Sequence, residues 1–143
     1  MGIAPSPYHI VLAEDNPADV GLVRVALREH AVECDLRVIS DGEAVLSFIN
    51  GLDLDTGLPC PDLVLLDLHL PKCDGNEILR HLRASERCWR TPVVMLTSSD
   101  PRLDGQHGEK KATTHYFQKT SSLDQFLQLG RVVKEVIRNE PSC

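Results

Sequence analysis

Residues 63–67 read Leu-Val-Leu-Leu-Asp, four large aliphatic side chains in a row followed directly by a carboxylate. A continuous apolar run of this length is typical of a β-strand that is covered on both faces, as the strands of parallel sheets are. We therefore predict a central parallel strand here, with Asp67 at the point where the strand ends.

Similar short runs occur on both sides of this stretch, at residues 10–13, 36–39, 93–96 and 114–117. Segments with helical spacing of apolar residues separate most of them. The first helix is predicted to begin at Asn16-Pro17 and the second at Asp41-Gly42, with a stripe of Val45, Phe48, Ile49 and Leu52. A third is predicted around Ile78, Leu79 and Leu82. The last is predicted to begin at Ser122 and to run to about Arg138.

Two connecting segments fit this pattern less well. Residues 101–112 contain two glycines and a single large aliphatic residue, so we expect the helix there to be short or mobile. Residues 50–61, with two glycines and two prolines, are predicted to form a long polar loop.

The order of elements is therefore βα repeated five times, which predicts an α/β fold with a parallel sheet. At 143 residues the commonest compact arrangement is the flavodoxin-like, doubly wound sheet with strand order 2-1-3-4-5. We expect one domain over residues 8–140, with short tails at 1–7 and 141–143. Ligands of such sheets bind beyond the carboxyl ends of the strands, where the strand order reverses.

Composition narrows the classes of function. A net charge of −6 argues against binding a nucleic-acid backbone, which needs a concentrated positive patch. No apolar run is long enough for a signal or membrane helix, so a cytoplasmic protein is expected. Five scattered cysteines without a Cys-x-x-Cys pair predict reduced thiols rather than a disulfide framework or a zinc site.

Reactive side chains follow the predicted strands. Glu14 and Asp15 end the first strand and Asp67 the third, Thr97 ends the fourth, and Lys119 comes just after the fifth. Three carboxylates at one sheet edge repel one another unless a cation lies among them, and their oxygens suit Mg²⁺. Asp67 is the candidate nucleophile, because a carboxylate can form an acyl phosphate. Lys119 and Thr97 would then contact phosphate oxygens.

These residues also carry a family resemblance. Over essentially its whole length the chain resembles the receiver domain of bacterial two-component response regulators. The matching elements, in order, are Glu14-Asp15-Asn16, the run Asp-Leu-His-Leu-Pro-Lys-Cys-Asp-Gly at 67–75, Thr97, Tyr116 and Lys119. The Glu-Asp-Asn-Pro-Ala-Asp opening and the loop before the third strand are similar to the small single-domain regulators that serve bacterial phytochrome-type kinases.

The resemblance implies that Asp67 accepts a phosphoryl group from a phosphohistidine of a sensor histidine kinase, in a Mg²⁺-dependent reaction. Asp15, Asp67 and the backbone carbonyl of His69 would bind the ion, with Glu14 acting mainly through water. The implied protein is a signalling domain rather than an enzyme: it catalyses only its own phosphotransfer and autodephosphorylation.

The resemblance also implies a switch. Thr97 and Lys119 would hold phosphate oxygens, and the ring of Tyr116 would follow the Thr97 hydroxyl inward.

The residue after the lysine is usually a proline with a cis bond in this family, but here it is Thr120. No output domain follows the last predicted helix, so we expect the signal to pass to a downstream protein by direct contact.

Apolar residues occupy more than one stripe of the last predicted helix, which exceeds what a surface helix needs. We therefore expect a homodimer that uses the fifth strand and this helix.

Three other functions compete with this interpretation. A phosphatase with an Asp nucleophile usually needs a second acid two positions later, where this chain has His69. A flavin-binding module needs a hydroxyl- and glycine-rich phosphate loop after the first strand, where Glu14 and Asp15 would repel phosphate. The third alternative is a degenerate receiver that only docks partners, against which the intact acidic set argues.

Overall fold

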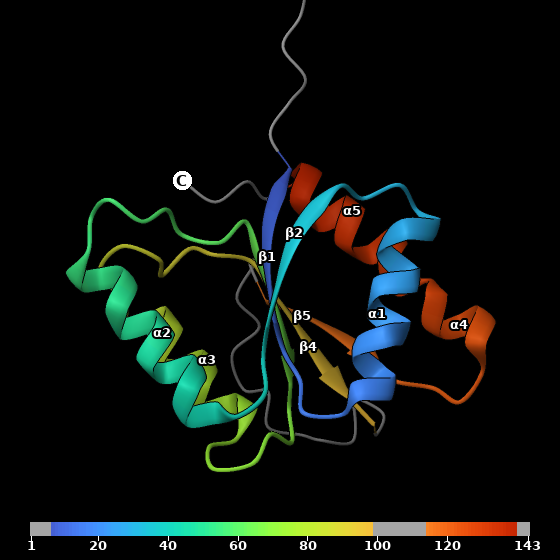
Figure 1. Cartoon of the computed structure of the whole chain (residues 1–143), viewed down its shortest axis with the longest axis horizontal. Helices are drawn as coiled ribbons and strands as arrows, with labels where there is room; N and C mark the ends of the chain where they lie inside the picture. Colours follow the sequence, from blue (N-terminus) through green and yellow to red (C-terminus); the bar gives the residue numbers. More distant parts are fainter. Residues whose placement is uncertain (1–6, 99–113, 140–143) are drawn as a thin grey trace, which may run out of the picture.

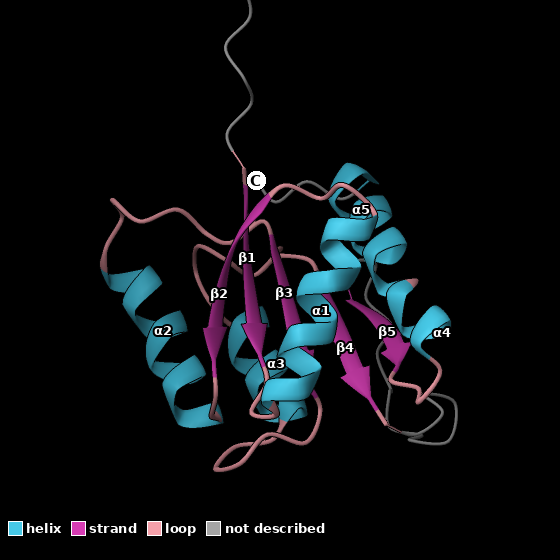
Figure 2. Cartoon of the chain, turned by 45° about the vertical axis from the view of Figure 1, so that its right-hand side comes forward, coloured by secondary structure: helices cyan, strands magenta, loops and turns pink. Residues whose placement is uncertain are grey.

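The computed structural model describes residues 7–98 and 114–139 (Figure 1). Its sheet has the strand order β2-β1-β3-β4-β5, and every neighbouring pair is parallel (Figure 2). This confirms the predicted flavodoxin-like topology. The elements, in chain order, are β1 (Tyr8–Ala13), α1 (Pro17–Glu29), β2 (Cys34–Ile39), α2 (Gly42–Leu54), β3 (Leu63–Asp67), α3 (Gly75–Arg83), β4 (Val93–Thr97), β5 (Thr114–Gln118), α4 (Leu123–Leu127) and α5 (Leu129–Asn139).

Helices cover both faces of the sheet. Helices α1, α4 and α5 lie on one side and α2 and α3 on the other (Figure 1). Successive side chains of a strand point to opposite faces of the sheet. Ile10 and Leu12 of β1 therefore join the core beneath α1, α4 and α5, whereas Val11 and Ala13 join the core beneath α2 and α3. All five residues of β3 are buried, as its unbroken apolar run predicts.

The helix starts confirm the caps expected from the sequence. The Asn16 side chain accepts hydrogen bonds from the backbone of Ala18 and Asp19 at the start of α1, with Pro17 as the first helical residue. Ser122 likewise accepts from the backbone N–H of Gln125.

Two predicted segments differ in the structure. Helix α2 continues to Leu54, which confirms the predicted stripe through Leu52, so the predicted loop beginning at residue 50 was wrong over its first five positions. Leu52 explains the extension, because it falls on the buried stripe of α2 and is only 3% exposed. The last helix is divided at Gln128, whose backbone N–H bonds three residues back to Gln125 and tightens the turn. The helix expected within residues 101–112 lies outside the described residues.

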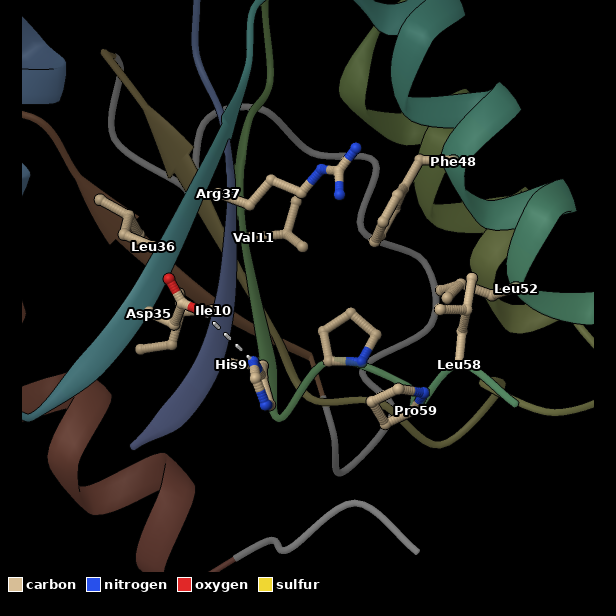
Figure 3. A pocket seen from close by; sticks show the side chains of 11 residues that line it. His9, Ile10, Val11, Asp35, Leu36, Arg37, Phe48, Leu52, Leu58 and Pro59 are labelled. Atoms are coloured by element: carbon tan, nitrogen blue, oxygen red, sulfur yellow. Dashed lines mark ion pairs between the residues drawn. The ribbon is translucent and has the colours of Figure 1, made fainter. Parts of the chain in front are cut away.

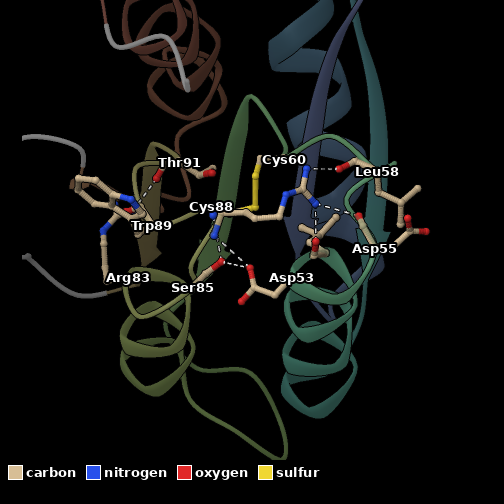
Figure 4. The surroundings of a disulfide bond; sticks show 11 residues. Asp53, Asp55, Leu58, Cys60, Arg83, Ser85, Cys88, Trp89 and Thr91 are labelled. Atoms are coloured by element: carbon tan, nitrogen blue, oxygen red, sulfur yellow. Dashed lines mark hydrogen bonds between the residues drawn. A yellow bond between two sulfur atoms is a disulfide. The ribbon is translucent and has the colours of Figure 1, made fainter.

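The cysteines are not all reduced thiols, as the sequence had suggested. Cys60 and Cys88 form a disulfide, whereas Cys34 and Cys73 are free (Figure 4). The two bonded cysteines precede β3 and β4, and the amino ends of these adjacent parallel strands bring them together. Since they are 28 positions apart, no local motif pointed to the pair.

Polar contacts also join the end of α2 and the loop that follows it to the loop before β4. Arg87 donates hydrogen bonds to the carbonyl oxygens of Leu52, Asp55 (2.9 Å) and Leu58 (2.6 Å). Asp53 accepts from the Ser85 hydroxyl at 2.6 Å and from the Arg87 N–H at 3.2 Å, and the Ser85 bond lowers the pKa of Asp53. The disulfide is therefore one part of a larger connection between the two loops (Figure 4).

Trp89 in the loop before β4 does not pack inward as a lone tryptophan usually does. Its side chain is 53% exposed, and the Arg90 guanidinium lies 5.6 Å from the ring centroid.

No helix in the described parts of the chain combines the length and the apolar character that a bilayer crossing requires.

Two helical glycines give a direct test of the packing between α1 and α5. A Cβ atom at Gly130 would collide with the carbonyl oxygen of Ala26 and approach the His30 ring to 2.6 Å, whereas a Cβ at Gly21 would meet nothing within 4 Å. We expect Gly130→Ala to lower the free energy of unfolding by about 2 kcal/mol through overpacking.

Gly21→Ala is the matched control on the exposed side of α1. It should raise the free energy of unfolding by about 0.5 to 1 kcal/mol, because alanine restricts the unfolded chain and favours the helix. Urea unfolding of both variants measures the two effects. Equal stability of the two variants would show that α1 and α5 do not approach as closely as described.

Candidate functional site

Three carboxylates meet at the carboxyl edge of the sheet, as the strand ends predicted. One ligand oxygen from each of Glu14, Asp15 and Asp67 lies within 4.8 Å of the others. Glu14 is 1% exposed and Asp67 is 6% exposed, while Asp15 is exposed to solvent. Asp15 is therefore the member of the cluster that solvent reaches most readily.

Backbone hydrogen bonds fix the positions of the two buried acids. The Glu14 N–H donates to Ile39 at 3.0 Å, which continues the β1–β2 pairing by one residue, and the Glu14 carboxylate accepts from the Asn16 N–H at 3.2 Å. The Asp67 carboxylate accepts from the His69 N–H at 3.1 Å. Both carboxylates are thus oriented by the chain that follows them.

The loop after Asp67 folds back tightly on the strand end. The Gly75 N–H donates to the Leu68 carbonyl at 2.9 Å. A Cβ at Gly75 would lie 2.8 Å from Leu68 Cα and 2.9 Å from the Asp67 carbonyl oxygen, so this position requires glycine. In the same loop Lys72 has a φ of 73°, the left-handed conformation that non-glycine residues seldom adopt.

Lys119 brings a positive charge to the acids. Its Nζ lies 2.6 Å from Glu14 Oε1 and 3.5 Å from Asp67 Oδ2, and its side chain is 15% exposed. Its backbone N–H donates to the Thr97 carbonyl at 2.6 Å, which joins β5 to the end of β4. Burial alone would lower the pKa of Lys119, but hydrogen bonds to Glu14 and Asp19 outweigh it, so the pKa lies above its ordinary value.

The charge state of Glu14 depends on its surroundings. Burial is the main cause that raises its pKa to about 7, and the nearby Asp67 carboxylate adds to the shift, while the Lys119 ammonium opposes it. An acid with a pKa near neutrality exchanges its proton readily for a cation.

The other predicted site residues lie close to this cluster or on the adjoining strands. Thr97 is fully buried at the end of β4, and His69, two residues after Asp67, is exposed. Tyr116 is half-buried on β5 and packs against the core on the α2 and α3 side. The described chain has no cis peptide bond, so the Lys119–Thr120 bond is trans.

Asp19 was not among the predicted site residues, although it closes the Glu-Asp-Asn-Pro-Ala-Asp opening, and the structure places it in contact with Lys119. Its carboxylate oxygen lies 2.9 Å from Lys119 Nζ, and its side chain is 23% exposed. Asp19 sits in the first turn of α1, five residues after Glu14, inside the acidic opening that resembles the receiver family. The apolar face of α1 sets the rotation of the helix, but the sequence pattern does not show that Asp19 contacts a lysine 100 positions away.

A cavity of about 480 Å³ lies elsewhere in the molecule, at the amino ends of β1 and β2 beside α2 (Figure 3). Phe48 and the loop containing Pro59 form part of its wall, and the Arg37 guanidinium lies 4.8 Å from the Phe48 ring centroid. None of the clustered acids lines this cavity. This cavity is therefore separate from the acidic cluster.

Fold and site together define an α/β domain with an acidic cluster and a lysine at the carboxyl edge of its sheet, and comparison with known proteins identifies its class. The response regulator receiver domain family matches residues 10–130, so the chain belongs to that family. Receiver domains of this family are phosphoacceptor signalling domains of two-component systems and are phosphorylated by histidine kinases. This confirms the resemblance read from the sequence, and neither the phosphatase nor the flavin interpretation is supported.

The relatives include regulators of phytochrome systems. The chain is 39% identical over 93 residues to the response regulator Rcp1 of Synechocystis sp., an alignment that covers 65% of this chain and 63% of Rcp1. It thus spans slightly less than two thirds of that relative. It is also 35% identical over 133 residues to the probable methanogenesis regulatory protein FilR2 of Methanothrix harundinacea, covering 93% of this chain and 83% of FilR2.

Solved structures of such regulators have the same fold. The phosphorylated cyanobacterial phytochrome response regulator RcpA superposes with a TM-score of 0.78 at 30% identity, covering 94% of this chain and 96% of RcpA. The Mn²⁺-bound form of Rcp1 superposes with a TM-score of 0.75 at 31% identity, covering 90% of this chain and 93% of Rcp1.

Proposed function

We propose that the chain accepts a phosphoryl group on Asp67 from the phosphohistidine of a sensor kinase and passes the signal on by protein contact. The observation that carries this proposal is the convergence of Asp67 with Glu14, Asp15 and the Lys119 ammonium at one sheet edge. Asp67 is the one member of the acidic set that is central in the sheet, lies at a strand end and has an ammonium group within 3.5 Å.

The donor set fits a hard divalent cation, and we assign it to Mg²⁺. Asp15, Asp67 and the His69 carbonyl would hold the ion, and Glu14 would act mainly through water. Carboxylate and carbonyl oxygens are the ligands that Mg²⁺ prefers, and one exposed member leaves room for water and phosphate. The ion would supply positive charge for the phosphoryl oxygens. Mn²⁺ binding by Rcp1 supports a divalent site in this family.

The protein's own groups have separate roles in the transfer. The Asp67 carboxylate would attack the phosphorus as the N–P bond of the kinase phosphohistidine breaks and the imidazole leaves, while Lys119 and the Thr97 hydroxyl bind phosphoryl oxygens. Thr97 and Tyr116 would then form the switch, because Tyr116 lies on the strand beside β4 and packs into the α2 and α3 side of the core. The domain would catalyse only its own phosphotransfer and the later hydrolysis of the acyl phosphate.

The relatives indicate which kind of kinase would phosphorylate the chain. The matches to RcpA and Rcp1 support a phytochrome-type kinase in the cytoplasm as the phosphoryl donor. From the phosphorylated domain the signal would pass to a downstream protein by direct contact.

We also propose a homodimer through β5 and α5, although the exposed apolar stripe on which the sequence prediction was based is not present on α5. Most apolar residues of α5 are buried in the core, and its outward face carries charged residues, Arg131, Lys134, Glu135 and Arg138. The dimer would therefore use β5, the last strand of the described sheet, and salt-sensitive contacts of α5. Light scattering that gives a monomer mass with and without a phosphate analogue would contradict it.

Treatment with acetyl phosphate and Mg²⁺ tests the proposed function. Intact mass spectrometry should show the addition of one phosphoryl group, and a chelator should prevent it. A protein that stays unmodified under both conditions would leave only the docking interpretation.

Metal affinity should depend on pH through Glu14. With a pKa of about 7, Glu14 is mostly protonated at pH 6 and mostly ionised at pH 8, and a cation needs the ionised form. Mg²⁺ should therefore bind about ten-fold more weakly at pH 6 than at pH 8 if one proton leaves on binding. Calorimetry in buffers of different ionisation enthalpy measures both the affinity and the proton release. Glu14→Gln should remove the proton release, and its persistence in that variant would contradict the assignment.

A further inference from the structure

Lys119 has more acidic partners than a phosphate-binding lysine needs. An ammonium group offers three N–H donors. Glu14 accepts one at 2.6 Å and Asp19 another at 2.9 Å, while Asp67 is an ion-pair partner at 3.5 Å. The acceptor of the phosphoryl group is thus the most distant of the three carboxylates.

Asp19 stands apart from the cluster that suits a metal ion. The oxygens that lie within 4.8 Å of one another come from Glu14, Asp15 and Asp67. The Asp19 N–H is fixed by the Asn16 cap at 3.4 Å, and its carboxylate reaches across from α1 to the lysine after β5. The side chains of Asp19 and Lys119 are 23% and 15% exposed, so water screens their attraction less than it would a surface pair.

We propose that Asp19 is a positioning residue that competes with the phosphoryl group on Asp67 for the Lys119 ammonium. This inference rests on the proposed function of Asp67. Before phosphorylation, Asp19 and Glu14 together hold the ammonium over the site. A phosphoryl group on Asp67 needs a hydrogen bond from the same ammonium group. The hydrogen bond to Asp19 opposes the movement of the Lys119 ammonium toward that phosphoryl group. Asp19 therefore weakens the hold on the phosphoryl group and sets how long the phosphorylated state lasts.

Asp19→Asn tests the competition. The ammonium would still be held by Glu14, but the amide lacks the charge that draws it toward α1, so Lys119 can move closer to Asp67. Beryllofluoride, a phosphoryl mimic, should bind with Mg²⁺ roughly three- to ten-fold more tightly to Asp19→Asn than to the wild type, measured by ¹⁹F NMR titration. Loss of the phosphoryl group after acetyl phosphate treatment should slow by a similar factor. Asp19→Glu, which restores the charge, should return both values toward the wild type.

A double-mutant cycle with Lys119→Gln separates this competition from a general effect of charge. The gain from Asp19→Asn should vanish in the Lys119→Gln background, because the two side chains act through their mutual contact. An equal gain in both backgrounds would overturn the inference. Asp124→Asn, which removes an exposed acid from the first turn of α4, is the matched control and should leave affinity unchanged.

The outcomes distinguish the two proposals. If the wild type binds no beryllofluoride, or if Asp67→Asn binds it equally well, the proposed function fails. If binding depends on Asp67 but Asp19→Asn binds no more tightly than the wild type, only the role of Asp19 is overturned. Urea unfolding of each variant confirms that affinity is compared between folded proteins.

Discussion

Asp67→Asn should lose phosphorylation by acetyl phosphate almost completely, with a rate at least about 100-fold below the wild type. An amide cannot attack phosphorus to form the acyl phosphate that the carboxylate forms. The variant should nevertheless fold, because asparagine has the same shape and its oxygen can still accept from the His69 N–H. Intact mass spectrometry over a time course measures the rate.

Asp74→Asn is the control for this substitution. Asp74 lies seven residues later, is exposed, and caps α3 by accepting from the Glu77 N–H at 3.0 Å, a role that asparagine fills equally well. We expect phosphorylation of this variant at the wild-type rate. Wild-type phosphorylation of Asp67→Asn would place the acceptor on another side chain.

Reduction of the Cys60–Cys88 disulfide should have the largest effect on stability. The bond closes a chain segment of 28 positions and so restricts the unfolded chain. Opening it should lower the free energy of unfolding by about 3 kcal/mol. The protein should stay folded after reduction, because Arg87 and Asp53 still hold the two loops together. Urea unfolding with and without reductant measures the difference.

The double variant Cys60→Ser/Cys88→Ser is the control, because reductant should not change its stability. Counting reactive thiols in the unfolded, unreduced wild type provides a second check, and two of its cysteines should fail to react. If every cysteine reacts and reductant changes nothing, the loops are connected by polar contacts alone.

Much of the site could be predicted because strand ends are visible in the sequence. The buried runs before Glu14, Asp67 and Thr97 define where three strands stop, and parallel topology brings those ends to one edge. The position of Lys119 follows from the same rule. Convergence of these residues needed only the strand order, which the alternation of strands and helices indicated.

Features that depend on contacts between segments far apart in the sequence could not be predicted. The disulfide joins loops whose proximity arises only after β3 and β4 pair. Asp19 faces Lys119 because of how α1 packs on the sheet. The additional apolar residues of the last helix were predicted to form an exposed stripe. Leu129, Val133 and Ile137 are instead buried, because α5 packs against α1 as well as against the sheet.

Location of the acyl phosphate tests the central claim most directly. Borohydride reduces an aspartyl phosphate to homoserine, so treatment of the phosphorylated protein followed by peptide sequencing by tandem mass spectrometry marks the modified residue. We predict homoserine at position 67 and at no other aspartate. Homoserine at Asp15 or Asp19, or a phosphate retained on a histidine or serine, would contradict the assignment of the acceptor.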